Sequence, residues 1–214
     1  MRVALFGATG NAGGAILRQC RAAGHEVHAL VRDPGALGLS DAGVRITAGD
    51  VRDVTAVSRV IDGATAVISA IGGTTAANPA VLERGTAAIL TVMPRHRVRR
   101  LIVIQGFHLQ FPGDPGNLSH LGQPAMSVLL RLWQPRLHAD TRRMSDLLRT
   151  CDVDWTLVRM PRLTAGPPDG RYRTGTLTLG PWSKVTTGQV GQFTVTCLAD
   201  GRYTRAAPMI ASAS

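Results

Sequence analysis

The chain has 214 residues, of which 44% are hydrophobic and only 4% are aromatic, and its formal net charge is +10. This length and composition suit one α/β domain with a largely aliphatic core, and no apolar stretch is long enough to cross a bilayer. The positive charge comes almost entirely from arginine, because Lys184 is the only lysine, and without a nucleic-acid-binding motif it favours anionic cofactors or substrates over nucleic acid as partners.

The N-terminal segment predicts a strand, a glycine-rich turn and a helix. Residues 3–6 form a short apolar run, and a helical pattern follows over residues 14–23. Gly7 would let the chain turn sharply out of the strand, Gly10 would remove a Cβ where the backbone approaches a phosphate, and Gly13 would let the helix pack closely on the sheet. Because the free N–H groups at the start of such a helix bind a pyrophosphate, this segment predicts a dinucleotide-binding site. A strand that begins so near the first residue also leaves no room for a signal peptide, so we expect a cytoplasmic protein.

The second predicted strand, residues 26–31, ends where the adenosine ribose lies in dinucleotide-binding folds. An acidic residue at this point accepts hydrogen bonds from a free 2′-hydroxyl, whereas a basic residue pairs with a 2′-phosphate. Arg32 follows the strand directly, so the sequence favours NADP(H) over NAD(H). In the alternative reading, Arg32 points into solvent or pairs with Asp33.

The remaining segments alternate between strands and helices, which predicts a parallel sheet covered on both faces. Strands are predicted over residues 44–48, 65–70, 101–104, 155–159 and 172–179, with an edge strand over 203–207. Helices are predicted from the N-cap Asp53 to Ile61, over 79–93, over 125–149 with a break at Pro135, and over 187–198. The long loop 105–123 follows a central strand, where ligands bind in open sheets. We therefore predict a Rossmann-type doubly wound α/β fold for a single domain, residues 1–214, in which residues 160–214 contribute the substrate-side region.

No metal site is predicted. The cysteines Cys20, Cys151 and Cys197 are far apart in the sequence and form no CxxC pair, so we expect reduced, buried thiols. The six histidines are scattered and include no HxxxH pair.

Several motifs together carry a family resemblance. They are Gly-Ala-Thr-Gly-Asn-Ala-Gly at 7–13, Leu-Val-Arg-Asp at 30–33, Gly-Asp-Val at 49–51, the apolar strand into Gln-Gly at 105–106, and Trp-Thr-Leu-Val-Arg-Met-Pro at 155–161. With them the chain resembles the atypical short-chain dehydrogenase/reductases, and within these the small NAD(P)H-binding proteins of the NmrA-like and biliverdin-reductase-B/flavin-reductase type. The resemblance extends to about Leu198.

The resemblance implies a cofactor lying along the C-terminal ends of the strands. By it, the glycine turn holds the pyrophosphate, Arg32 holds the 2′-phosphate, Asp50 and Val51 flank the adenine, and Met160 and Pro161 lie near the nicotinamide. Asp50 could alternatively cap the next turn, and Met160 could be a plain core residue. The candidate cofactor-binding residues are Gly7, Thr9, Gly10, Asn11, Ala12, Gly13, Arg32, Asp50, Val51, Ala70, Ile71, Gly72, Gln105, Gly106, Met160 and Pro161.

The sequence departs from the resemblance in its proton-transfer residues. Conventional members carry a Tyr-xxx-Lys pair, but Tyr172 and Tyr203 are followed four residues on by Thr176 and Ala207. The serine or threonine expected after the fifth strand is also missing. The groups that could substitute are Gln105 and His108, which follow that strand, and Asp140 on the next predicted helix. Asp140 shares a helix face with Arg143, and the alternative reading of these two residues is a surface ion pair.

Three functions remain open at this point. The first is an NADP(H)-dependent reductase of a small planar or carbonyl substrate, because hydride transfer needs only placement of the nicotinamide against an acceptor. The second is a non-enzymatic NADP(H)-sensing regulator, which the missing proton relay would suit. The third is a non-redox cyclase or isomerase on the same fold. A small-molecule substrate, no membrane partner, and a monomer or homodimer are expected.

Overall fold

The structure is a computed structural model that describes residues 1–37, 43–73, 78–106, 132–180 and 182–213. Its strands are β1 (Arg2–Phe6), β2 (Glu26–Val31), β3 (Val44–Ala48), β4 (Ala66–Ser69), β5 (Arg100–Gly106), β6 (Asp154–Met160), β7 (Arg162–Thr164), β8 (Tyr172–Gly175), β9 (Lys184–Thr186) and β10 (Met209–Ser212). Its helices are α1 (Asn11–Ala22), α2 (Val54–Ile61), α3 (Val81–Val92), α5 (Pro135–Thr150) and α6 (Thr187–Ala199), with the 3₁₀ turns η1 (Pro34–Leu37) and η2 (Met93–His96).

The strands form a central sheet of eight in the order β3-β2-β1-β4-β5-β6-β10-β8. Every neighbouring pair is parallel except β10 and β8, which are antiparallel. The order reverses direction at β1, which pairs with β2 on one side and with β4 on the other. β7 and β9 form a separate parallel pair. The predicted Rossmann-type doubly wound α/β fold is confirmed.

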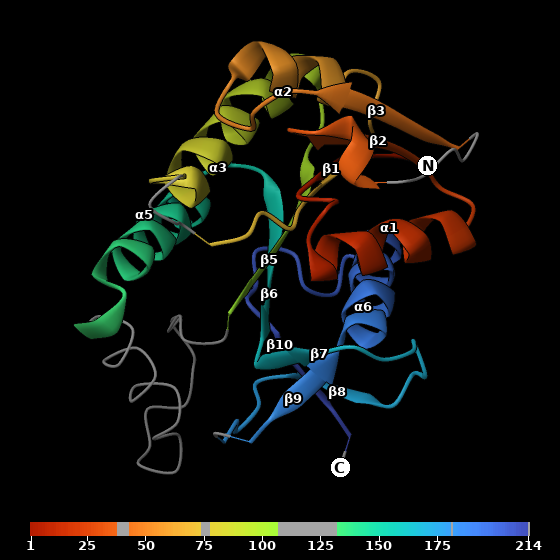
Figure 1. The fold of residues 1–214 in the computed structure, drawn as a ribbon, viewed down its shortest axis with the longest axis vertical. Coiled ribbons are helices and arrows are strands. Elements are labelled where there is room, and N and C mark those ends of the chain that lie inside the picture. Colours follow the sequence, from red (N-terminus) through yellow and green to blue (C-terminus); the bar gives the residue numbers. More distant parts are fainter. Residues whose placement is uncertain (38–42, 74–77, 107–131, 181, 214) are drawn as a thin grey trace.

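Helices cover both faces of this sheet (Figure 1). One core lies between the sheet and the helices α2, α3 and α5, and the other lies between the sheet and α1 and α6. Side chains alternate between the two cores along each strand, as in β6, where Leu157 faces the first and Val158 faces the second. Buried on both faces, the central strands read as continuous apolar runs, and this is why their positions could be predicted.

Predicted and observed elements differ mainly after β6. The strand expected over 203–207 is wrong, because residues 202–205 form turns and the strand lies at β10 instead. Tyr203 is fixed in the turn, since its carbonyl accepts a hydrogen bond from Thr156 Oγ1 (2.7 Å) and its ring packs edge-on against Phe193. The strand expected over 172–179 ends at Gly175, whose φ of +111° breaks the extended conformation. The short strands β7 and β9 were not predicted.

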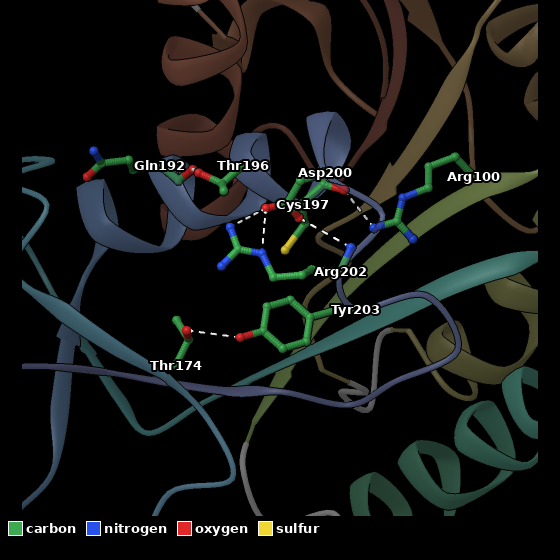
Figure 2. A network of polar contacts seen from close by, with 8 residues as sticks. All are labelled: Arg100, Thr174, Gln192, Thr196, Cys197, Asp200, Arg202 and Tyr203. Atoms are coloured by element: carbon green, nitrogen blue, oxygen red, sulfur yellow. Dashed lines mark hydrogen bonds and ion pairs between the residues drawn. The ribbon is translucent and has the colours of Figure 1, made fainter.

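Figure 2 shows the contacts that hold the C-terminal end of α6 against the sheet. Arg100 of β5 donates hydrogen bonds to the carbonyl of Cys197 from Nη2 (2.6 Å) and to the carbonyl of Asp154 from Nη1 (2.8 Å). Beyond the helix, the hydroxyl oxygens of Tyr203 and Thr174 are 3.1 Å apart. The hydrogen bond from Arg100 satisfies a carbonyl group in the last turn of α6, which has no partner within the helix. The contact between Tyr203 and Thr174 links the turn after α6 to β8.

The buried histidine His28 is expected to make the stability of the protein fall at acid pH. His28 in β2 is 4% exposed, and its Nε2 lies 2.8 Å from Thr47 Oγ1 on β3. Burial, together with the charges of Arg45 and Arg2, lowers the pKa of His28 below its ordinary value, and Asp62 opposes this effect. Since the unfolded chain then binds the proton more readily, the stabilisation is complete above about pH 6.5 and is lost as the pH falls toward the folded-state pKa.

We therefore expect His28→Gln, which cannot take up a proton, to lose less stability than the wild type between pH 7 and pH 5. Each unit of difference between the folded and unfolded pKa of His28 corresponds to about 1.4 kcal/mol. Urea unfolding of both proteins at several pH values measures the two slopes. Parallel curves for wild type and variant would show that His28 does not set the acid sensitivity.

Candidate functional site

A cavity of about 490 Å³ lies along the C-terminal ends of the central strands. It reaches from the end of β3, past the glycine turn after β1, to the ends of β5 and β6. Most of the residues predicted from the sequence line it: Gly7, Thr9, Gly10, Asn11, Ala12, Arg32, Asp50, Val51, Ala70, Ile71, Gly72, Gln105 and Met160. Gly13, Gly106 and Pro161 are not part of the lining, although each is adjacent in sequence to a residue that is. The volume of the cavity falls in the range typical of small-molecule and cofactor sites.

Two glycines of the turn are required by the packing of the backbone. A Cβ at Gly13 would lie 2.0 Å from the carbonyl oxygen of Gly7, and a Cβ at Gly7 would lie 2.3 Å from that of Ala70. Gly7 also has a φ of +86°, a conformation that other residues rarely adopt. Glycine at position 13 therefore permits close contact between α1 and the end of β1, and glycine at position 7 permits close contact with the backbone after β4.

Gly10 differs from its neighbours, because the protein itself leaves room for a side chain there. A Cβ at Gly10 would lie 3.5 Å from the carbonyl oxygen of Gly7, an ordinary van der Waals distance. Its φ of −79° and ψ of 163° are accessible to any residue. Gly10 lines the cavity, so the absence of a side chain matters on the side where a ligand would lie.

The N-terminal end of α1 presents free hydrogen-bond donors to the cavity. Gly10 is the N-cap of α1 and supplies no side-chain cap. The first N–H group of the helix that donates a hydrogen bond to a backbone carbonyl is that of Gly14, whose acceptor is the carbonyl oxygen of Gly10 (2.8 Å). In the part of the chain that the structure describes, the N–H groups of Asn11, Ala12 and Gly13 have no hydrogen-bond acceptor. Such an end, with its partial positive charge, suits a pyrophosphate.

Beyond β2 and β3, the cavity wall carries the guanidinium of Arg32 and the carboxylate of Asp50. Arg32 donates from Nη1 to Asn78 Oδ1 (3.0 Å), so a specific contact holds its guanidinium at the cavity wall. Asp50 is paired with Arg52, whose Nη2 lies 2.6 Å from its carboxylate. Hydrogen bonds from Arg52 lower the pKa of Asp50 to about 2, so Asp50 is ionised at neutral pH and its charge is balanced. Asp33 accepts a hydrogen bond from the N–H of Gly35 (2.9 Å).

At the opposite end of the cavity, Gln105 forms part of the wall. Its Oε1 accepts a hydrogen bond from the N–H of Gly106 (3.1 Å), which fixes the direction of the amide. Its Nε2 is buried and has no hydrogen-bond partner among the described residues. Because a buried donor without a partner is costly, this group is suited to an acceptor atom on a bound molecule. Met160 lies next to it, across the paired strands β5 and β6.

The other two candidate catalytic residues lie elsewhere. Asp140 is 3% exposed and is not in the cavity lining. It accepts hydrogen bonds from the N–H groups of Leu82 (3.0 Å) and Glu83 (2.8 Å), so it caps the start of α3, where Ala80 has no side chain that could do so. Arg143, which was expected to share a helix face with Asp140, forms an ion pair with Glu83 instead, with 3.2 Å between Nη1 and Oε2. His108 falls outside the described residues.

Nine residues that line the cavity were not among the predicted site residues: Phe6, Leu30, Val31, Gly49, Gly73, Asn78, Val81, Ile104 and Leu163. Gly73 directly follows the predicted residue Gly72 after β4, so the sequence carried a signal for it. Asn78 and Leu163 carry no such signal, because Asn78 lies in the connection before α3 and Leu163 lies in the unpredicted short strand β7.

Two further sets of reactive side chains, the buried cysteines and a Ser58–His96–Asp62 series, lie outside both cavities. Burial raises the pKa of Cys20 and of Cys197 to about 12, so both thiols are unreactive. Ser58, His96 and Asp62 are linked in series, with His96 2.8 Å from the serine hydroxyl and 3.3 Å from the carboxylate. This chain lines neither cavity and ties η2 to α2.

The described helices include none with the length and hydropathy of a membrane span. Across the same residues, no three His, Cys, Asp or Glu side chains are grouped as they would be around a metal ion.

Comparison with known proteins relates the whole chain to one family. Residues 7–201 match a family described as NAD(P)H-binding. The uncharacterized protein YwnB of Bacillus subtilis (strain 168) is 27% identical over 177 residues, which cover 82% of this chain and 79% of YwnB.

Solved structures share the fold over nearly their whole length. The oxidoreductase ylbE from Lactococcus lactis superposes with a TM-score of 0.79 at 15% identity, covering 100% of this chain and 92% of its own. ChuY, an anaerobillin reductase from Escherichia coli O157:H7, superposes with a TM-score of 0.76 at 18% identity, covering 98% and 96%. At these identities the likeness establishes the fold alone.

Proposed function

The chain belongs to the NAD(P)H-binding family, and we propose that it is an NADPH-dependent reductase of a small planar acceptor such as a flavin or a quinone. The observation that carries the proposal is the cavity along the strand ends, which has free helix amides at its middle, a cation at one end and a free donor at the other. Relatives of the same fold include proteins named as an oxidoreductase and a reductase.

The residues fit a dinucleotide in one orientation. The amides of Asn11 and Ala12 would hold the pyrophosphate, because they are unpaired donors at a helix start. Arg32 would meet the 2′-phosphate, which favours NADPH over NADH. Asp50, already neutralised by Arg52, adds no repulsion at this end.

The nicotinamide end then lies beside Gln105 and Met160. When bound, the reduced nicotinamide supplies a hydride to the acceptor. Gln105 Nε2 would donate a hydrogen bond to the molecule that is reduced, and Met160 would provide an apolar wall beside it. The acceptor would take this hydride together with a proton from water, which would convert it to its dihydro form. A planar acceptor of this kind needs no Tyr-xxx-Lys pair, which the sequence lacks.

The direct test is consumption of NADPH by the purified protein in the presence of FMN, a quinone, a ketone or an aldehyde. We expect turnover with the flavin or the quinone and none without an acceptor. Gln105→Leu keeps a similar volume but removes the donor, and we expect kcat to fall about tenfold while the Kd for NADPH changes little.

Tight NADPH binding without turnover on any acceptor would contradict the reductase and favour a sensing protein. Product formation from an isomerisable substrate without NADPH would contradict both. Equal kcat values for wild type and Gln105→Leu would remove Gln105 from the reaction while leaving the cofactor site in place.

A further inference from the structure

A second cavity, of about 470 Å³, lies on the outer side of the glycine turn. Thr9, Gly10, Asn11 and Leu163 line both cavities, so the turn is the wall between them. Its remaining boundary includes η1, the first turns of α1 and the start of α6. Since η1 begins two residues after Arg32, this cavity borders the same end of the dinucleotide site as that arginine.

The second cavity is lined by one charged residue, Arg18, and by no acidic residue. Within the described ranges, Arg18 takes part in no hydrogen bond or ion pair. Its side chain folds back toward the start of α1, because Nη1 lies only 3.7 Å from where a Cβ would be at Gly14. A solvent-exposed arginine on a helix normally extends into water, whereas this one adds its charge to the positive end of the helix.

The charges around the turn suit a phosphate monoester. Arg32 stands in the first cavity and Arg18 in the second, one on each side of Thr9–Gly10–Asn11. The pyrophosphate of a dinucleotide is already matched by the amides of α1. The 2′-phosphate of NADPH carries close to two negative charges at neutral pH, which two cations balance better than one.

We propose that the second cavity receives the 2′-phosphate of NADPH and that Arg18, together with Arg32, sets the preference for NADPH over NADH. This inference rests on the proposed function, since it assigns a further specificity residue to the same cofactor site. Thr9 lines both cavities and its hydroxyl has no hydrogen-bond partner among the described residues, so it is available to the same phosphate.

The test compares ligands with and without the 2′-phosphate. NADPH, NADH, 2′,5′-ADP and 5′-AMP are titrated against the wild type, Arg18→Met, Arg18→Lys and Arg32→Met. We expect Arg18→Met to weaken the binding of NADPH and of 2′,5′-ADP about tenfold, while the affinities for NADH and 5′-AMP change less than about twofold. Arg18→Lys should retain part of the preference, and Arg32→Met should show the same selectivity as Arg18→Met.

Arg59→Met is the matched control, because Arg59 is an exposed arginine on α2 outside both cavities. It should leave all four affinities unchanged. An unchanged NADPH affinity in Arg18→Met would overturn the inference. So would an equal loss for NADPH and NADH, which would assign Arg18 to the pyrophosphate.

The inference and the proposed function fail in different ways. If the wild type bound neither dinucleotide, the proposed function would be lost. Binding of 2′,5′-ADP that still depended on Arg18 would even then support the assignment of the second cavity to a phosphate.

Discussion

Replacing Gly13 with alanine is expected to destabilise the protein by about 3 kcal/mol or more, because the added methyl group has no space. Its Cβ would lie 2.0 Å from the carbonyl oxygen of Gly7 and 2.7 Å from the carbonyl carbon. Both atoms belong to the backbone at the end of the central strand β1, so relief requires α1 to move away from the sheet. Urea unfolding followed by circular dichroism measures the loss.

The neighbouring glycine is the control. A Cβ at Gly14 would lie 3.4 Å from the carbonyl oxygen of Ala8 and 3.7 Å from Arg18, so Gly14→Ala fits with little adjustment. Alanine is also favoured over glycine inside a helix by up to about 1 kcal/mol. The two variants should therefore differ strongly in stability. Similar unfolding curves would mean that α1 does not pack on the strand end as closely as described.

The second large effect is on binding rather than on folding. Gly10→Asp is expected to weaken the binding of NADPH at least about a hundredfold, while the protein stays as stable as the wild type or becomes slightly more stable. Aspartate is a preferred N-cap, and Gly10 occupies that position with a compatible backbone conformation. Its carboxylate would accept the amide hydrogen bonds that the pyrophosphate needs and would also repel it.

Thermal unfolding and an NADPH titration of the same preparation separate the two properties. Gly10→Ala is the companion variant, since it adds bulk at the cavity without competing for the amides. We expect it to bind more weakly than the wild type and more tightly than Gly10→Asp. Full NADPH affinity in Gly10→Asp would place the pyrophosphate somewhere other than the start of α1.

The sequence was sufficient for the central sheet and for the glycine turn. Strands such as β1 and β4 are buried on both faces, so each forms a short apolar run whose ends can be recognised in the sequence. Asp53 caps α2 as expected, because an N-cap acts within two residues of itself and needs no tertiary contact. Local rules therefore located most elements and most of the cavity lining.

The features that escaped prediction depend on contacts between distant residues. Asp140 has the residue type of a proton-transfer group, yet it caps a helix whose first residues lie 58 positions earlier in the chain. The 2′-phosphate contact of Arg32 stays a prediction, whereas its hydrogen bond to Asn78, 46 positions away, could not be predicted from a local pattern. β7 and β9 are three residues each, too short to display a period, and they form only because each supplies the other's hydrogen bonds.

The central claim is that unpaired main-chain amides at the start of α1 hold the diphosphate of NADPH. A crystal structure of the protein soaked in NADPH tests it most directly. We expect diphosphate oxygens within hydrogen-bond distance of the amides of Asn11 and Ala12, with the nicotinamide toward Gln105 and Met160. A crevice that stays empty at saturating NADPH, or one in which the diphosphate lies away from α1, would contradict the account.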